Sequence, residues 1–490
     1  MENVPSYIDA KSNEPKIICF YNFKIIKMND IKFTLIIVLI FSFSLASAQI
    51  KQTRPNIVIV MADDLNSAQL SCYGGENLKT AHIDALADEG MKFNNMICSE
   101  AMCVPTRASL FTGLYPMRHG SFQNHKRVYD SVPIQSVSQY LRKEGYRVAL
   151  SGKDHSTKPV SVFPFEIVEG FEPKCVSVTD EYDLTKITEY ITKEDDPFCL
   201  FIMSINPHGP YTVGDPLEFK ASELKLPPDW IDTPSTRDRF TKYLAEVRRL
   251  DDQVGDVVKM LKDTNKYDNT IVVFLGEQGA QFPGGKWNLW DQGQKSSMIV
   301  KWNKTVTPGS QSDAIVQYED ITPTLIDIAG GSPHKNLDGK SFLSVLRGQS
   351  DLHREYAYGI HNNVPEGPAY PMRSIRTSRY KLIRNLLPES EYYIKWFMNT
   401  KQKNSDNLWA SWRDMGKISS NAELLYNRII KRPAIEFYDI QKDPYELNNL
   451  VEDPNYKDKI IAFDISLRQW MLEQGDTGIL VDKHYPKSKK

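Results

Sequence analysis

The segment Asn56-Ile57-Val58-Ile59-Val60-Met61-Ala62-Asp63-Asp64 (NIVIVMADD, residues 56–64) decides the fold class, because a short apolar run ends in two carboxylates. Continuous apolar runs of this length are typical of strands that are buried on both faces of a parallel sheet. Similar runs occur at residues 147–150 (RVAL), 198–203 (FCLFIM) and 270–275 (TIVVFL), with helical patterns between them. The sequence therefore predicts an α/β fold with a large mixed, mostly parallel sheet flanked by helices.

Polar residues follow each of these four apolar runs. They are Asp63-Asp64, Gly152-Lys153-Asp154-His155, Asn206-Pro207-His208 and Gly276-Glu277-Gln278. Ligands of open α/β sheets bind at the carboxyl ends of the strands. We therefore expect acids, a lysine, two histidines and an amide to meet in one polar cleft.

A second region begins after about residue 350, where aromatic and basic residues dominate. The stretches 380–383 (YKLI) and 436–439 (EFYD) predict antiparallel strands, and residues 456–474 predict a final helix. We expect a large domain over residues 49–350 and a smaller C-terminal α+β subdomain over residues 351–490. In the large domain, apolar residues at helical spacing over 237–262 predict a long helix that packs on the core.

The composition excludes several classes of protein. The chain has 490 residues, 60 Lys and Arg against 62 Asp and Glu, and 41% hydrophobic residues, which is an ordinary globular composition. A formal charge of -2 without a dense Lys/Arg stripe argues against a nucleic-acid partner, whose phosphates require basic contacts.

The N-terminal residues predict export. An apolar run over 33–45 is too short to span a bilayer, and it ends in Ala46-Ser47-Ala48, as a signal peptide does. We predict a signal peptide over residues 1–48 that is cleaved after Ala48, and Met28 stands where a start codon would leave a signal of usual length. The expected location is periplasmic or secreted, without a stable membrane anchor.

The segment Cys103-Val104-Pro105-Thr106-Arg107-Ala108-Ser109-Leu110-Phe111-Thr112-Gly113 (CVPTRASLFTG, residues 103–113) is the most informative for chemistry. Pro105 suits the first turn of a helix, so Cys103 is expected at a helix N-terminus, where the helix dipole favours an anion. A lone cysteine is more often a buried apolar thiol, but here several positions fit one motif. The segment resembles the signature of the sulfatase family, with Thr106 where Ser is usual.

The resemblance implies an alkaline-phosphatase-like fold and a modified nucleophile. In that family a formylglycine-generating enzyme converts the cysteine, here Cys103, to Cα-formylglycine (3-oxoalanine), whose hydrated aldehyde attacks sulfur. The exported chain has five cysteines, so four remain if Cys103 has this role, and three disulfide pairings stay open.

A calcium site is also implied by the resemblance. Asp63 and Asp64 are similar to the family's metal-binding pair, and adjacent carboxylates need a cation or separate partners. Glu277 and Gln278 stand where the family usually has Asp and Asn, each with one additional methylene. The expected Ca²⁺ ligands are therefore Asp63, Asp64, Cys103, Glu277 and Gln278.

Further residues match family elements one by one. Lys153 and Lys286 correspond to the lysines that bind sulfate, and Arg107 to the arginine that activates the nucleophile. His155 corresponds to the histidine that takes the remaining diol proton, and His208 to the one that protonates the leaving group.

In the C-terminal part, residues 370–374 (YPMRS) and 437–446 are similar to the N-sulfoglucosamine sulfohydrolase branch of the family. Arg373, in the first of these segments, is expected as a substrate contact, and so is His361, although no motif supports His361. The predicted function is removal of sulfate from sugars of a sulfated polysaccharide, such as ulvan or a heparan-like glycosaminoglycan, by O–S or N–S cleavage.

Two alternatives stay open at this point. One is a phosphatase or phosphodiesterase of the same superfamily, which would use Ser or Thr and two zinc ions. The other is an inactive carbohydrate-binding relative, against which the joint presence of Cys103, Arg107, Lys153, His155 and His208 argues. The sugar, the sulfated position, endo or exo action and the oligomeric state are not determined.

Overall fold

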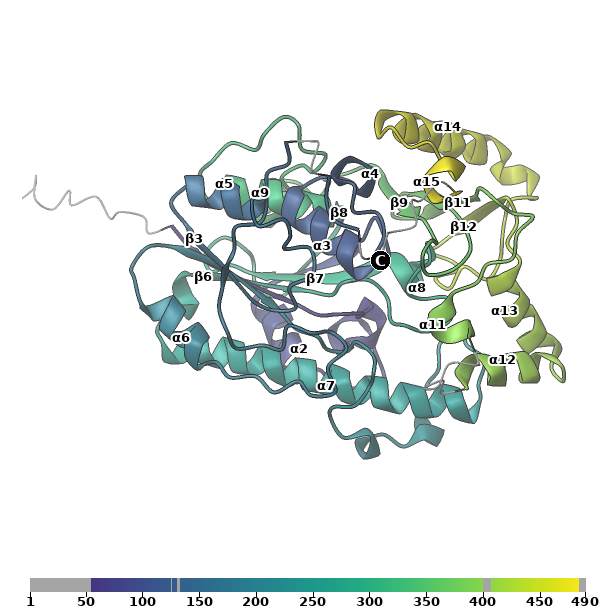
Figure 1. Ribbon diagram of the computed structural model, residues 1–490, viewed down its shortest axis with the longest axis horizontal. Helices are drawn as coiled ribbons and strands as arrows, with labels where there is room; N and C mark the ends of the chain where they lie inside the picture. Colours follow the sequence, from purple (N-terminus) through teal and green to yellow (C-terminus); the bar gives the residue numbers. More distant parts are fainter. Residues whose placement is uncertain (1–53, 125, 130–132, 400–406, 484–490) are drawn as a thin grey trace, which may run out of the picture. The chain divides into compact units, whose positions relative to one another are not determined.

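A mixed sheet forms the centre of the larger part of the molecule (Figure 1). The computed structural model describes residues 54–124, 126–129, 133–399 and 407–483, and the predicted signal peptide, residues 1–48, lies outside them. Within these ranges the sheet has eight strands in the order β4-β3-β5-β1-β6-β7-β2-β8. They are β1 (Asn56–Met61), β2 (Met91–Ile97), β3 (Arg147–Gly152), β4 (Glu166–Ile167), β5 (Phe198–Met203), β6 (Thr270–Leu275), β7 (Lys295–Lys301) and β8 (Ser310–Gln317).

The strand pairings confirm the predicted fold class. β1 pairs in parallel with β5 and β6, and β3 pairs in parallel with β5 and β4. β7 is antiparallel to both of its neighbours, β6 and β2, which makes the sheet mixed. β1, β5 and β6 have the predicted bounds, whereas β3 extends two residues further, to Gly152.

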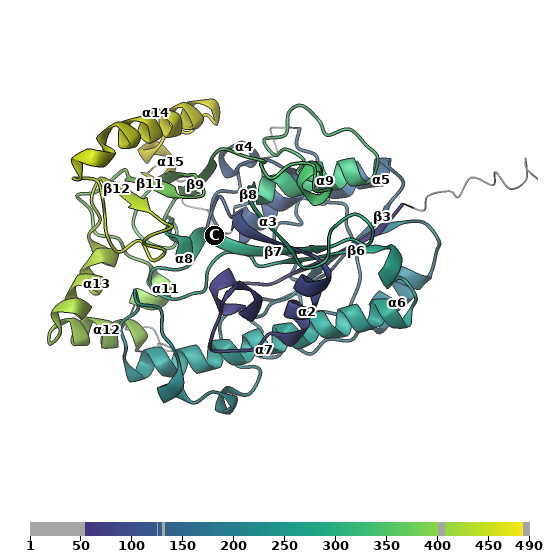
Figure 2. The same cartoon turned by 180° about the vertical axis from the view of Figure 1, so that it is seen from behind.

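Helices cover both faces of this sheet (Figures 1 and 2). One face carries α2 (Ala81–Glu89), α6 (Thr185–Thr192) and the long α7 (Pro234–Asp263). The other carries α3 (Cys103–Thr112), α5 (Val137–Lys143) and α9 (Ile321–Ile328). Alternate residues of β1 face opposite sides, so Val58 and Val60 pack in the core of the α7 side and Ile57 and Ile59 in the other.

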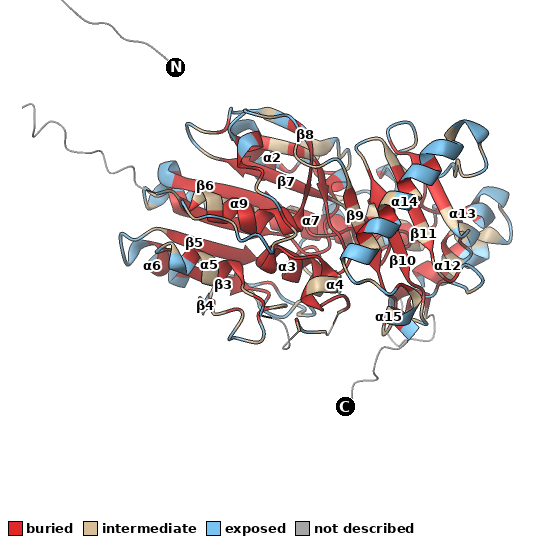
Figure 3. Cartoon of the chain, turned by 90° about the horizontal axis from the view of Figure 1, so that it is seen from above, coloured by how far each residue is buried: buried red, intermediate tan, exposed pale blue. Residues whose placement is uncertain are grey.

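The C-terminal region contains a second sheet, which is antiparallel, in the order β12-β11-β10-β9. Its strands are β9 (Ala357–His361), β10 (Met372–Arg376), β11 (Tyr380–Asn385) and β12 (Ile435–Asp439). The final helix α14 (Lys457–Glu473) packs Phe463, Leu467 and Trp470 on one face of this sheet. Figure 3 shows β9, β10 and β11 buried, with α14 lying across them and α13 (Ser420–Ile430) beside them.

Shorter helices complete the described ranges. They are α4 (Pro116–His119), α8 (Asp291–Gln294), α10 (Leu343–Leu346), α11 (Lys395–Met398), α12 (Leu408–Gly416) and α15 (Ile479–Lys483). The predicted boundary at residue 350 falls between α10 and β9, and both sheets belong to one compact unit. Among the helices of the described ranges, none is long and apolar enough to cross a membrane.

Candidate active site

The carboxyl end of β1 positions two carboxylates at the middle of the sheet. Asp64 has a φ of 59°, in the left-handed region, which Asp adopts more readily than most side chains. Its carbonyl accepts a hydrogen bond of 3.0 Å from the Tyr243 hydroxyl of α7. The Asp63 N–H donates to the Asn206 carbonyl at 2.9 Å, which ties the loop after β1 to the loop after β5.

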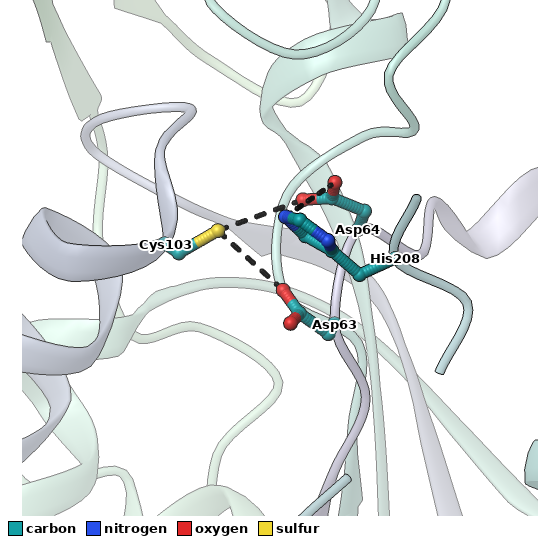
Figure 4. A group of neighbouring side chains, drawn as sticks. All are labelled: Asp63, Asp64, Cys103 and His208. Atoms are coloured by element: carbon teal, nitrogen blue, oxygen red, sulfur yellow. Dashed lines mark hydrogen bonds and ion pairs between the residues drawn. The ribbon is translucent and has the colours of Figure 1, made fainter. Parts of the chain in front are cut away.

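Cys103 lies at the first residue of α3, as predicted, with Pro105 in the first turn. Its sulfur lies 3.4 Å from Asp63 Oδ1, 3.7 Å from Asp64 Oδ1 and 3.1 Å from Lys286 Nζ. Figure 4 shows the side chains of Cys103, both aspartates and His208 pointing toward one another from the start of α3, the end of β1 and the loop after β5. Burial, reinforced by Glu277, raises the pKa of the Cys103 thiol well above its usual range.

Charges are balanced around this sulfur. The described residues bring together three buried carboxylates and three buried cations: Asp63, Asp64, Glu277, Arg107, Lys153 and Lys286. Lys153 Nζ contacts Asp63 Oδ2, and Lys286 Nζ lies 2.7 Å from Asp64 Oδ1. Arg107 Nε lies 2.6 Å from Glu277 Oε1. Burial alone would raise the pKa of Asp63, but Lys153 and other cations hold it well below its usual value.

The five predicted metal ligands lie in one cluster. Gln278 Nε2 lies 3.5 Å from the Cys103 sulfur and donates at 2.9 Å to Glu277 Oε2. Gln278 Oε1 is buried and has no hydrogen-bond partner within the described ranges. Carboxylate and amide oxygens are the ligands that Ca²⁺ prefers, so this donor set fits a hard divalent cation.

His208 joins the same cluster, although the sequence analysis assigned it to the leaving group. One ligand atom from each of Asp63, Asp64, Cys103 and His208 lies within 4.8 Å of the others. His208 Nδ1 lies 2.6 Å from the Gly209 carbonyl, so Nδ1–H donates there and Nε2 faces Asp64 Oδ2 at 3.7 Å. Burial lowers the pKa of His208, and the two aspartates oppose this shift.

His155 lies at the wall of the cavity above Cys103. Its Nε2 lies 3.7 Å from the Cys175 sulfur, and its Nδ1 is buried without a hydrogen-bond partner in the described part of the chain. Burial, with a further contribution from Lys153, lowers the pKa of His155 to about 2. The imidazole is therefore neutral at physiological pH.

A cavity of about 830 Å³ opens over Cys103 and is large enough for a sugar ligand. Cys103, His155, His208 and Lys286 line it. Its other lining residues include five basic side chains and four aromatic ones: Lys126, Arg127, Lys158, Arg239, Lys242, Tyr211, Trp287, Trp396 and Phe397. Sequence reasoning gave these residues no role, because, apart from Trp287 beside Lys286, they lie outside the recognised motifs and come from widely separated parts of the chain.

The structure places His361 and Arg373, the two expected substrate contacts, away from the lining of the cavity. Both side chains are fully buried, and neither lines the cavity. His361 Nδ1 lies 3.0 Å from Glu100 Oε1, and its Nε2 lies 3.2 Å from Asn363 Oδ1. The Arg373 guanidinium forms two contacts with Asp476, one of 2.9 Å from Nη2. Both side chains therefore form their hydrogen bonds with other residues of the protein.

Arg373→Ala is expected to lower the free energy of unfolding by about 3–5 kcal/mol, because it leaves the Asp476 carboxylate buried without its partner. Urea unfolding would measure the loss. As a control, Arg413→Ala removes an exposed contact of 3.3 Å to Asp414 and should cost about 1 kcal/mol or less. A raised KM for sugar substrates with unchanged stability would instead assign Arg373 to substrate binding.

Comparisons with known proteins identify the family of the chain. The sulfatase family model matches residues 55–332, and the C-terminal model of N-sulphoglucosamine sulphohydrolase matches residues 284–415. An ulvan-active sulfatase of Formosa agariphila is 34% identical over 432 residues, which cover 86% of this chain and 81% of that protein. Human N-sulphoglucosamine sulphohydrolase is 26% identical, with 89% of this chain and 95% of that protein covered.

Solved structures share the fold. One is a complex with its substrate D-glucosamine-2-N,6-O-disulfate, with a TM-score of 0.66, 21% identity, and 87% of this chain and 99% of that chain covered. Another, a phosphonate monoester hydrolase of Agrobacterium radiobacter, has a TM-score of 0.65, 17% identity, and 86% and 96% covered. The chain belongs to the sulfatase family. The predicted fold and enzyme class are confirmed.

Proposed function

We propose that the protein is a Ca²⁺-dependent sulfatase that uses formylglycine at position 103 to remove sulfate from sugars of a sulfated polysaccharide. The observation that carries the proposal is the position of the Cys103 sulfur. It lies at the start of α3, 3.1 Å from Lys286 Nζ and within 3.7 Å of two carboxylates, on the wall of a sugar-sized cavity.

Two groups that the family implies fit these residues. The aldehyde hydrate made from Cys103 by a formylglycine-generating enzyme supplies the oxygen that attacks sulfur, and Ca²⁺ stabilises negative charge on oxygen. Asp63, Asp64, Glu277 and Gln278 would hold the ion together with residue 103. The unpartnered Oε1 of Gln278 supports this assignment.

Lys153 and Lys286 are assigned to the sulfate oxygens. Both ammonium groups are buried, and both already contact carboxylates beside the Cys103 sulfur. Fixed cations in a site closed to water stabilise charge that develops on a transferred group without reorganising. Arg107 holds Glu277 at 2.6 Å and so orients the second pair of ligands.

The two histidines are assigned to proton transfer. The hydrogen bond from His208 Nδ1–H to Gly209 directs Nε2 into the site, where it can protonate the departing oxygen or nitrogen. His155 lines the same cavity and its Nδ1 has no hydrogen-bond partner in the described part of the chain, so this ring nitrogen is assigned to accept the remaining proton of the diol.

The substrate class follows from the cavity and the relatives. Basic and aromatic side chains together suit an anionic sugar, and relatives named as ulvan-active and N-sulphoglucosamine enzymes support ulvan or a heparan-like glycosaminoglycan. The signal peptide assigned to residues 1–48 would export the enzyme to the periplasm or beyond the cell, where such polysaccharides occur.

The first experiment is sulfate release by matured protein from defined sulfated oligosaccharides, with phosphate and phosphonate esters in the same panel. Turnover of the phosphorus esters alone would favour the phosphodiesterase alternative.

His208→Ala should slow sugar-sulfate cleavage by roughly 10²- to 10⁴-fold, the usual contribution of a general acid. Cleavage of nitrophenyl sulfate should slow far less, because nitrophenolate leaves without a proton. Steady-state kcat/KM on both substrates measures the difference. Lys153→Ala should slow both reactions, since the sulfate is common to them, and His82→Ala, an exposed histidine, is the neutral control. If His208→Ala lowered kcat/KM equally on both substrates, the result would identify His208 as a ligand of the sulfate group and not as the general acid.

A further inference from the structure

Glu366 lines the cavity that contains Cys103 and has one buried carboxylate oxygen without a hydrogen-bond partner among the residues described. The residue is 1% exposed, and the oxygen is Oε1. A buried acceptor without a partner is costly, so such an atom on a cavity wall indicates a ligand group that completes it.

The rest of the Glu366 side chain is fixed in place. Oε2 accepts a hydrogen bond from the Trp396 indole N–H of α11 and lies 3.4 Å from Lys395 Nζ. The Glu366 carbonyl accepts from the Lys395 N–H at 2.9 Å, and its own N–H donates to the Asn363 carbonyl at 2.7 Å. These hydrogen bonds fix the turn at residues 363–366 against α11, and they leave Oε1 as the carboxylate oxygen of Glu366 without a partner in the described ranges.

Neighbouring aromatic residues complete a surface of the kind that binds sugars. Trp287 lines the same cavity, and its Nε1 is a buried donor without a partner in the described ranges. Trp287 follows Lys286, and its N–H donates to the Ala101 carbonyl at 3.0 Å, so it is close to the start of α3. The Phe397 ring lies 6.1 Å from the Trp287 ring, and the Trp396 side chain is 43% exposed.

We propose that Glu366 is a specificity-determining residue, whose Oε1 accepts a hydrogen bond from a hydroxyl of the sulfated sugar. Trp287 Nε1 donates to an oxygen of the same sugar, and the faces of Trp396 and Phe397 pack against its ring. A carboxylate at this position repels sulfate and carboxylate groups, so the sugar carries a free hydroxyl there. The assignment rests on the proposed function and narrows its substrate to sugars that are not sulfated at this contact.

The decisive variant is Glu366→Gln, because it keeps the size of the side chain and the acceptor for Trp396. The amide then presents an NH₂ group to the cavity in place of an acceptor. We expect kcat/KM on the best sulfated oligosaccharide to fall by roughly 10- to 100-fold, the usual weight of a hydrogen bond to a charged group. Nitrophenyl sulfate, which has no sugar hydroxyl, should be unaffected.

A substrate series identifies the hydroxyl. Deoxy analogues of the oligosaccharide, each lacking one hydroxyl, are compared in the wild type and in Glu366→Gln. For one deoxy analogue, the fall in kcat/KM of the wild type should equal the fall that Glu366→Gln causes on the full substrate. Glu366→Gln should then show no further fall in kcat/KM on that analogue. Trp287→Phe, which keeps a ring and removes the N–H, should cost roughly 2- to 10-fold on the sugar substrate, as a neutral hydrogen bond does.

Glu436→Gln is the matched control. Glu436 is also buried and accepts an indole N–H, from Trp290 at 2.8 Å, but it does not line the cavity. Its substitution should leave the ratio of sugar to aryl activity unchanged. Equal losses on both substrates for Glu366→Gln with a lower Tm, or no loss on the sugar, would overturn the proposal. If the matured wild type released sulfate from no sugar, the proposed function would fail, and this assignment with it.

Discussion

Replacing Cys103 with alanine is expected to reduce sulfate release by roughly 10⁵- to 10⁶-fold, as loss of a nucleophile does in other hydrolases. The substitution removes the atom from which the reacting oxygen is made, and the surrounding lysines and histidines then have no group to activate. Folding should be retained, because only one small side-chain atom is lost at the wall of a cavity. Sulfate release and the melting curve measure the two effects.

The control and the covalent test belong to the same experiment. Cys72→Ala changes a half-buried cysteine outside the cavity and should leave activity unchanged. Mass analysis of active wild type should find the Cys103 peptide lighter by the exchange of SH₂ for oxygen. Full activity of protein that carries the unmodified thiol would refute the assigned nucleophile.

Removing the divalent cation is expected to give the second largest effect. Chelation should abolish most of the activity and lower the free energy of unfolding, by about 2.7 kcal/mol relative to protein at a free Ca²⁺ concentration of 100 times Kd. The physical reason is that the cation binds only where Asp63, Asp64 and Gln278 are held together, which is in the folded state. Activity and Tm with and without chelator check both parts.

Asp64→Asn tests the same site without chelator. It removes one of three carboxylates and leaves Lys286, which lies 2.7 Å from Asp64 Oδ1, without its charged partner. The variant should be inactive, should bind no Ca²⁺, and should show the same Tm with and without chelator. Asp351→Asn, at an exposed aspartate, should respond to Ca²⁺ as the wild type does. Two zinc ions per chain in the active wild type would support the phosphatase alternative.

Strands and helices were predictable where the residues of one short segment have a clear apolar pattern. The apolar run of β1 fills two cores with alternate residues, and β5 and β6 are equally continuous, so their bounds were correct. The helix over 237–262 was recognised by its spacing and is α7, Pro234–Asp263. β7 and β8 were missed, because each begins with polar residues and becomes a strand through pairing with β2.

The cysteines show the limit of reasoning from counts. The five described cysteines are free, so the disulfide pairings that their number left open are absent from the described part of the chain. Cys199 is buried in β5, and Cys175 lies beside His155 at the cavity. The number of cysteines in a sequence does not show which of them lie close enough together to form a disulfide.

The sequence by itself determined the α/β class, the helix N-terminus at Cys103 and the motif residues that gather around it, because each depends on neighbours within a few positions. Only the tertiary structure decided which oppositely charged side chains form ion pairs. It pairs Arg373 with Asp476, and it places Glu366 at the wall of the cavity. Glu366 lies 263 positions after Cys103, and no local pattern encodes a contact over that separation. Such contacts are set by how the two sheets pack, since packing alone brings these distant side chains together.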